Sequence, residues 1–264
     1  MKDINLEERV VIGSKNIVTS NPDQVDKPLV VRGVIKKDHV QKCISQGRDF
    51  YYVDTGYFGN FPSQGNPSGK KLWHRLVKNE NQLSQIRITP SDRWDNLVRQ
   101  DSRLKWTGWK NFTKKILLVM PNPKACKYYN VDYDTWVRET SEKIQKVVDL
   151  PIEVRIKGSR SGRNHEYSIY DAFDSGVYAT VSFNSIAAVE SVLYGIPGFV
   201  AVPCAGSPLC SSNLSDLKNP FKPDLKTILQ HCYNLAYGQF TVDELQNGTA
   251  WKILQENYET FSQR

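Results

Sequence analysis

The segment over residues 178–203 carries side chains suited to holding a phosphorylated ligand. Its pattern predicts a strand, then Asn184 or Ser185 as the cap of a helix that begins near Ile186. The amide groups exposed at a helix start, together with the helix dipole, form a site for phosphate. Glu190 follows one turn into this apolar helix, where a carboxylate can accept hydrogen bonds from ribose hydroxyls. The segment predicts a nucleotide site, unless it is an ordinary capped helix whose Glu190 is solvated.

This order of strand, Asn-Ser, small residues, Val-Glu and Gly-Ile-Pro resembles the nucleotide-sugar half of GT-B-fold glycosyltransferases over roughly residues 115–203. The resemblance implies that Ser185, Ile186 and Ala187 lie near the diphosphate of a nucleotide-sugar. It also implies that Glu190 binds the ribose. Nucleotide-sugar 2-epimerases share the pattern, so it indicates a donor site better than it indicates a reaction.

A cluster of cations lies at the end of a predicted strand in the second half of the chain. Arg155 and Lys157 match by position the cations with which GT-B enzymes neutralise a leaving diphosphate, where fixed positive charge stabilises the developing negative charge. Arg160, Arg163 and His165 follow in a Gly- and Ser-rich loop and can instead contact a nucleic-acid backbone. A solvated basic loop is the alternative for all five.

The candidates for a general base lie in the first half of the chain. Transfer of a sugar to a hydroxyl needs a group that takes the acceptor proton, and a carboxylate or an imidazole can do so. Asp54, at the end of a predicted strand, is the first candidate, His74 is the second and Asp38 the third. An Asp before Thr-Gly is also a common turn residue, so a structural role for Asp54 stays open.

The run Val-Asp-Thr-Gly-Tyr-Phe-Gly over 53–59 resembles a segment of hypothetical proteins from tailed bacteriophages that have a GT-B-like C-terminal half. Such phages modify their own DNA, including glycosylation of 5-hydroxymethylpyrimidines. The resemblance implies a DNA-modifying glycosyltransferase with double-stranded DNA as a partner. Two alternatives remain: a glycan-directed glycosyltransferase or nucleotide-sugar 2-epimerase, and a non-enzymatic nucleic-acid-binding α/β protein.

Alternating strands and helices must position these residues. Strands are predicted over 28–33, 50–54, 72–77, 85–88, 115–121, 152–157, 178–183 and 197–202, and helices over 36–46, 132–148, 186–194 and much of the chain after 224. Because parallel strands need crossover helices, this alternation predicts the α/β class. We expect two small Rossmann-like lobes of GT-B type with a cleft between them. The acceptor-side lobe would span 1–125, and the nucleotide-sugar lobe with its terminal helices 126–264.

Composition restricts the class of protein further. The chain has 264 residues, a formal net charge of +7 and 11% aromatic residues, which together are typical of a basic globular protein and not of a disordered chain. Its apolar runs are too short to span a membrane, and its polar start lacks a leader, so we expect a cytoplasmic protein, in the host cytoplasm if it is viral. The five irregularly spaced cysteines predict reduced structural thiols and not a zinc site.

Absent motifs narrow the chemistry. A Gly-x-x-x-x-Gly-Lys-Ser/Thr loop and a Gly-x-Gly-x-x-Gly run are both missing, which argues against P-loop enzymes and dinucleotide oxidoreductases. No Asp-x-Asp ends an apolar strand, since the one over 132–134 opens a predicted helix. We therefore expect no obligatory metal or cofactor and a nucleotide-sugar donor, with a UDP-sugar first among the candidates.

Overall fold

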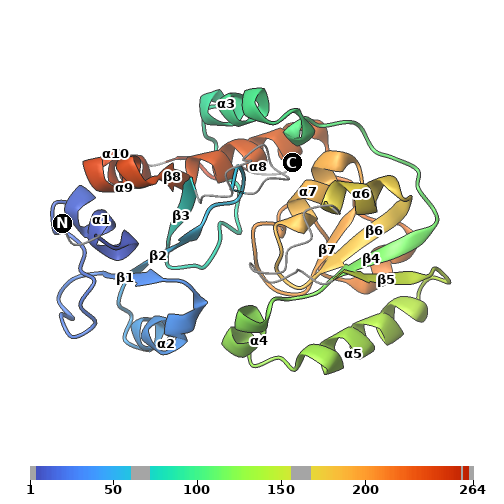
Figure 1. Ribbon diagram of the computed structural model, residues 1–264, viewed down its shortest axis with the longest axis horizontal. Coiled ribbons are helices and arrows are strands. Elements are labelled where there is room, and N and C mark those ends of the chain that lie inside the picture. The colour runs from blue at the N-terminus through green and yellow to red at the C-terminus, as the bar shows by residue number, and fades with distance from the viewer. Residues whose placement is uncertain (1–3, 61–71, 156–167, 257, 262–264) are drawn as a thin grey trace.

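Two four-stranded sheets organise the described part of the chain, each in its own lobe (Figure 1). The computed structural model describes residues 4–60, 72–155, 168–256 and 258–261. The strands are β1 (Leu29–Arg32), β2 (Phe50–Thr55), β3 (Trp73–Lys78), β4 (Lys115–Val119), β5 (Ile152–Arg155), β6 (Val177–Ser182), β7 (Gly198–Val200) and β8 (Gln239–Thr241). The α-helices are α1 (Leu6–Gly13), α2 (Lys37–Ser45), α3 (Asp92–Gln100), α4 (Pro123–Tyr129), α5 (Tyr133–Gln145), α6 (Ile169–Asp174), α7 (Ala187–Tyr194), α8 (Leu225–Tyr237), α9 (Val242–Asn247) and α10 (Thr249–Gln255). Short 3-10 turns are η1 (Val34–Lys36), η3 (Ser102–Leu104) and η4 (Leu214–Lys218). No helix in these segments is both long and apolar enough to cross a membrane.

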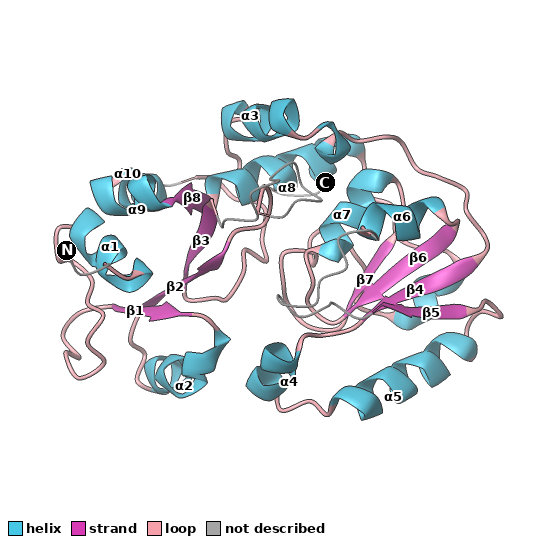
Figure 2. Ribbon diagram, viewed as in Figure 1, coloured by secondary structure: helices cyan, strands magenta, loops and turns pink. Residues whose placement is uncertain are grey.

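The second sheet is the parallel sheet that the sequence predicts. Its strand order is β5-β4-β6-β7, and each neighbouring pair is parallel. The central strand β4 is apolar along its length because both of its faces are covered, as is usual for a parallel sheet. Helix α5 covers one face of the sheet, and α6 and α7 cover the other (Figure 2). Ile116 and Leu118 pack with α5, whereas Leu117 packs with α6 and α7.

The first sheet is mixed, with strand order β1-β2-β3-β8. Only β1 and β2 are parallel, while β3 pairs antiparallel with both β2 and β8. The strand β8 comes from the far end of the chain, where the sequence pattern predicts helices. It is only three residues long and lies between two helices, so its period of two is too short to detect.

The two sheets do not divide at residue 125. The strand β4 over 115–119 belongs to the second sheet, and β8, α9 and α10 return to the first lobe. There Phe240 and Leu245 join Val10 and Val30 in one buried cluster. The predicted strand over 85–88 is wrong, since the segment forms only an isolated bridge, between Arg87 and Thr260.

A single hydrophobic core joins the lobes. It contains Tyr57 and Phe58 from the first lobe, Val189 from α7, and Ile228 and Leu235 from α8. Figure 1 shows α8 leading from the second lobe to β8 in the first. Each small sheet therefore completes its core with residues from the other lobe.

Arg93 on α3 ties the returning C-terminal segment to the rest of the protein. Its guanidinium donates to the carbonyls of Ala236 and Gln239, at 3.1 and 2.8 Å, and to both carboxylate oxygens of Glu244, at 2.6 and 3.1 Å. The Arg93 side chain is 15% exposed and that of Glu244 22%. Burial opposes ionisation of Glu244, but hydrogen bonds from Arg93 and Thr241 outweigh it and lower the pKa of the carboxyl group.

Arg93→Ala should lower the free energy of unfolding by about 3 kcal/mol, because it leaves a half-buried carboxylate and two carbonyls without their donor. Urea denaturation measures the change. Arg138→Ala is the matched control, since Arg138 is 62% exposed and pairs with Glu142 at 3.6 Å, and it should cost less than about 1 kcal/mol. Equal losses in the two variants would contradict the role of Arg93 in holding the C-terminal segment.

A buried histidine on α8 makes the stability depend on pH. His231 is completely buried and donates from Nε2 to the carbonyl of Ala205 at 2.6 Å. Burial lowers the pKa of His231 to about 4, so its ring is neutral in the folded protein at pH 7. The unfolded chain takes up a proton near pH 6.5. Stability is therefore fully present above that pH and is lost as the pH falls toward 4.

His231→Gln should remove this pH dependence. In the unsubstituted protein, His231 should contribute about 2 kcal/mol more to the free energy of unfolding at pH 7.5 than at pH 5. Glutamine keeps a donor for the Ala205 carbonyl and does not titrate. Urea denaturation at the two pH values measures the difference, and an identical pH dependence in the variant would contradict the assignment.

Candidate functional site

The carboxyl ends of strands from both sheets face each other across the two lobes. The turn η1 follows β1, helix α4 follows β4, and these two segments are in contact. Lys37 at the start of α2 donates to the side-chain oxygen of Asn130, at the end of α4, at 2.9 Å. Ligands of α/β proteins bind beyond the carboxyl ends of the strands. We therefore describe where each predicted site residue lies relative to these strand ends.

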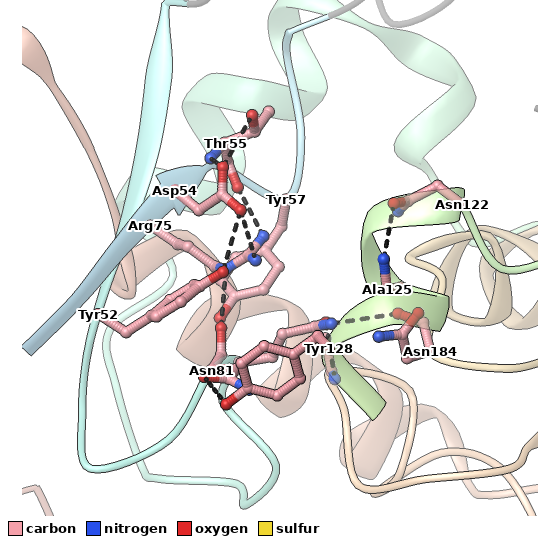
Figure 3. Close-up of polar contacts among 12 residues, drawn as sticks. Tyr52, Asp54, Thr55, Tyr57, Arg75, Asn81, Asn122, Ala125, Tyr128 and Asn184 are labelled. Atoms are coloured by element: carbon pink, nitrogen blue, oxygen red, sulfur yellow. Dashed lines mark hydrogen bonds and ion pairs between the residues drawn. The ribbon is translucent and has the colours of Figure 1, made fainter. Parts of the chain in front are cut away.

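Asp54 lies at this edge within a polar network (Figure 3). Its Oδ1 accepts from the amide of Thr55 at 2.7 Å, and its Oδ2 accepts from the Tyr52 hydroxyl at 3.2 Å and from Arg75 at 3.4 Å. Arg75 also donates to the carbonyls of Thr55 and Asn81, both at 2.8 Å. The Asp54 side chain is 30% exposed and Arg75 is 14% exposed, so the carboxylate is held firmly and is still accessible.

The electrostatics of this network keep its two side-chain donors, Arg75 and Tyr52, protonated at neutral pH. Burial alone would lower the pKa of Arg75, but the charge of Asp54 opposes this and the pKa is raised. Burial and the same carboxylate raise the pKa of Tyr52, which therefore remains a hydrogen-bond donor at neutral pH. Asp54 is thus next to a guanidinium that stays charged and a phenol that stays protonated. Arg75 is a site residue that the sequence pattern did not single out, because its pairing depends on the strand register.

The backbone after Asp54 is fixed by a residue far along the chain. The buried Gln239 of β8 accepts from the amides of Tyr57 and Phe58 at 2.7 and 2.9 Å. Gly56 is required at this close approach, since a Cβ there would lie 2.9 Å from both the Gln239 side-chain oxygen and the Cβ of Trp73. The turn that follows Asp54 therefore has a defined shape only when β8 is in place.

His74, the second base candidate, is on the other face of the sheet. In the register of β2 and β3, Arg75 lies opposite Asp54 and His74 lies opposite Thr55. Because successive strand residues point to opposite faces, His74 points away from the Asp54 network. It is 6% exposed and lies opposite Phe240 of β8. The third candidate, Asp38, is exposed in the first turn of α2.

The predicted helix start near Ile186 is present, as the first residue of α7 is Ala187. The predicted cap is wrong: Ile186 is the N-cap in place of Asn184 or Ser185, and its side chain makes no capping hydrogen bond. The Ser185 hydroxyl accepts from the amide of Ala187 at 3.2 Å, and its carbonyl accepts from Ala188 at 3.1 Å. The amide of Glu190 donates to Ile186 at 3.0 Å. A phosphate at this turn would therefore replace the Ser185 hydroxyl as the acceptor of the hydrogen bond from the Ala187 amide. It would also accept a hydrogen bond from the Ser185 hydroxyl.

Glu190 lies among charged and aromatic side chains of the second lobe and of η3. It is 6% exposed. Burial, then the charge of Glu190, raises the pKa of Tyr170. Arg103 donates to both oxygens of Asp101, at 2.8 and 2.9 Å; these bonds raise the pKa of Arg103 most, and Glu190 adds to the effect. The sequence pattern did not reveal Arg103, which approaches Glu190 from a segment more than 80 positions away.

Arg155 is the last residue of β5 and lies at the expected edge. Val119 pairs with both Arg155 and Ser182, so the ends of β5, β4 and β6 are level. The other predicted cations, Lys157, Arg160, Arg163 and His165, lie outside the described residues.

A cavity of about 520 Å³ lies apart from these groups. It lies on the α5 face of the second sheet, with Trp136 and Lys143 on one side, Val181 and Phe199 beneath and Asn213 opposite. In the described segments, no cluster of three His, Cys, Asp or Glu residues could hold a metal ion.

Two Rossmann-like lobes whose strand ends meet define a glycosyltransferase-like fold. The chain is similar to the solved structure of KpsC from Thermosulfurimonas dismutans, a beta Kdo 2,4 transferase. The TM-score is 0.50 with 11% sequence identity, over 89% of this chain and 88% of that chain. At this identity the similarity shows the fold. No protein-family model matches the chain, and no curated protein sequence matches it.

Proposed function

We propose that this protein is a glycosyltransferase that moves a sugar from a nucleotide-sugar to a hydroxyl group. The observation that carries the proposal is the meeting of strand ends: an accessible, oriented Asp54 in one lobe and the start of α7 in the other. The similarity in fold to a Kdo transferase supports it. A UDP-sugar is the first donor to test.

The proposed chemistry is a single displacement at the anomeric carbon. Asp54 takes the proton of the acceptor hydroxyl, whose oxygen forms a bond to that carbon. The bond from the carbon to the phosphate oxygen breaks, and its electron pair leaves with the nucleotide. Arg155, with Lys157, would stabilise that negative charge, and the dipole of α7 would add to it. Arg75 and Tyr52 orient the Asp54 carboxylate.

We propose 5-hydroxymethylpyrimidine in DNA as the acceptor, supported by the resemblance of residues 53–59 to phage proteins and by the net charge of +7. A glycan is the second candidate, because the structurally similar protein is a Kdo transferase. A thermal-shift screen first identifies the stabilising donor, the nucleotide-sugar that most raises the melting temperature of the protein. Mass spectrometry of hydroxymethylated DNA and of a glycan acceptor, each incubated with that donor, then separates the two. Salt-sensitive DNA binding without stabilisation by any UDP-, GDP-, CMP- or dTDP-sugar would instead indicate a non-enzymatic DNA-binding protein.

Glu190→Gln should weaken nucleotide-sugar binding about tenfold or more, because a carboxylate accepts stronger hydrogen bonds from ribose hydroxyls than an amide does. Isothermal calorimetry with the stabilising donor measures the change. Glu142→Gln on the exposed side of α5 is the control and should bind normally. Unchanged affinity with a lower melting temperature would instead show that Glu190 is a structural partner of Arg103.

Asp54→Asn should lower kcat by about 10²-fold or more, since the amide keeps the shape of the side chain but cannot take the proton. His74→Gln should leave kcat within about twofold, because His74 points to the other face of the sheet. Initial rates at saturating donor measure both variants, and circular dichroism checks their folding. A large loss of kcat in His74→Gln but not in Asp54→Asn would make His74 the base in place of Asp54.

A further inference from the structure

The loop after β3, residues 79–84, carries contacts between the two halves of the candidate site; we call it the bridging loop. Its base is anchored in the first lobe. Asn79 exchanges hydrogen bonds with Phe50, at 2.9 Å for each amide. The Leu83 amide donates to the Tyr57 hydroxyl at 2.9 Å, and the Leu83 side chain packs against Gly238, where a Cβ would come within 2.3 Å of it.

The tip of the bridging loop reaches the second lobe through Gln82. Its side-chain nitrogen donates to the carbonyl of Asn184 at 3.1 Å, and its side-chain oxygen accepts from the amide of Ala205 at 3.2 Å. One amide group thus satisfies two backbone groups, one in the loop after β6 and one in the loop after β7. A backbone carbonyl and a backbone amide cannot both be satisfied by a charged or apolar side chain of similar size.

The bridging loop also belongs to the Asp54 network. Arg75 donates to the carbonyl of Asn81, and the Asn81 side chain is 3.4 Å from the hydroxyl of Tyr128 on α4 (Figure 3). One peptide bond joins Asn81 to Gln82. A continuous path therefore runs from the Asp54 carboxylate through Arg75 and the bridging loop to Asn184, the residue before Ser185.

We propose that Gln82 is a positioning residue that aligns the start of α7 with Asp54. The predicted change in kcat rests on the proposed function. The predicted change in hydrogen exchange at the two loops rests on geometry alone. The lobes share a core, so removal of Gln82 leaves them joined and releases only the two loops. Misplacement of reacting groups by about 1 Å can cost 10²-fold in rate.

Gln82→Ala should raise the hydrogen exchange of the Ala205 amide and of residues 184–188, while the β4 amides remain protected. It should lower kcat at saturating donor by about tenfold or more. It should also weaken donor binding, because the proposed donor contacts Ser185 and Ala187 lie in the segment that the substitution releases.

Gln82→Glu is the second variant. Its carboxylate still accepts from the Ala205 amide, but it has no donor for the Asn184 carbonyl. Hydrogen exchange should therefore rise more at residues 184–188 than at Ala205. Gln41→Ala, on the exposed side of α2, is the control.

Exchange that rises only at Ala205, with residues 184–188 unchanged, would overturn the positioning role. So would faster exchange at 184–188 with an unaltered kcat. If the native protein neither binds nor transfers any sugar, the proposed function fails, and the exchange at 184–188 alone then decides whether Gln82 holds the start of α7.

Discussion

The pairing of β8 with β3 is the contact on which the first lobe and the candidate site both depend. It places Gln239 beneath the turn after Asp54, where its side chain accepts from two consecutive backbone amides. A buried amide left without an acceptor is costly, so this turn has a defined shape only when the end of the chain has returned. The last helices are consequently part of the lobe that carries Asp54, and Arg93 fixes them to α3.

The need for a shared core follows from the size of the sheets. A four-stranded sheet exposes apolar faces that a few short helices cannot cover completely, and small domains bury a smaller fraction of their surface. Here α8 and α3 supply side chains to one cluster together with the turn over Tyr57 and Phe58. Sites built from facing loops need such a scaffold, because loops alone hold reacting groups poorly. Leu83 of the bridging loop is part of this common core.

The sequence predicted the four strands of the second sheet within two residues, because parallel strands are buried on both faces and appear as continuous apolar runs. It missed α4 and α6 and extended α5 three residues too far. It also predicted β2, which ends one residue after Asp54, and the helix that starts after Ile186. It ranked Asp54 before His74 as the candidate base, but it could not show the face of the sheet to which each side chain points. The register determines those faces, since a shift of one residue would exchange them.

By itself, the amino-acid sequence determined the α/β class, the strands β4 to β7, and the placement of Asp54 and Arg155 near strand ends and of Ser185 just before a helix. These are local properties, encoded in the period of the hydrophobic pattern. Only the tertiary structure decided which residues meet: Arg75 with Asp54, Arg103 near Glu190, and Gln82 between two loops of the other lobe. Those pairs join segments whose approach depends on register and on the return of β8. No local pattern encodes either one.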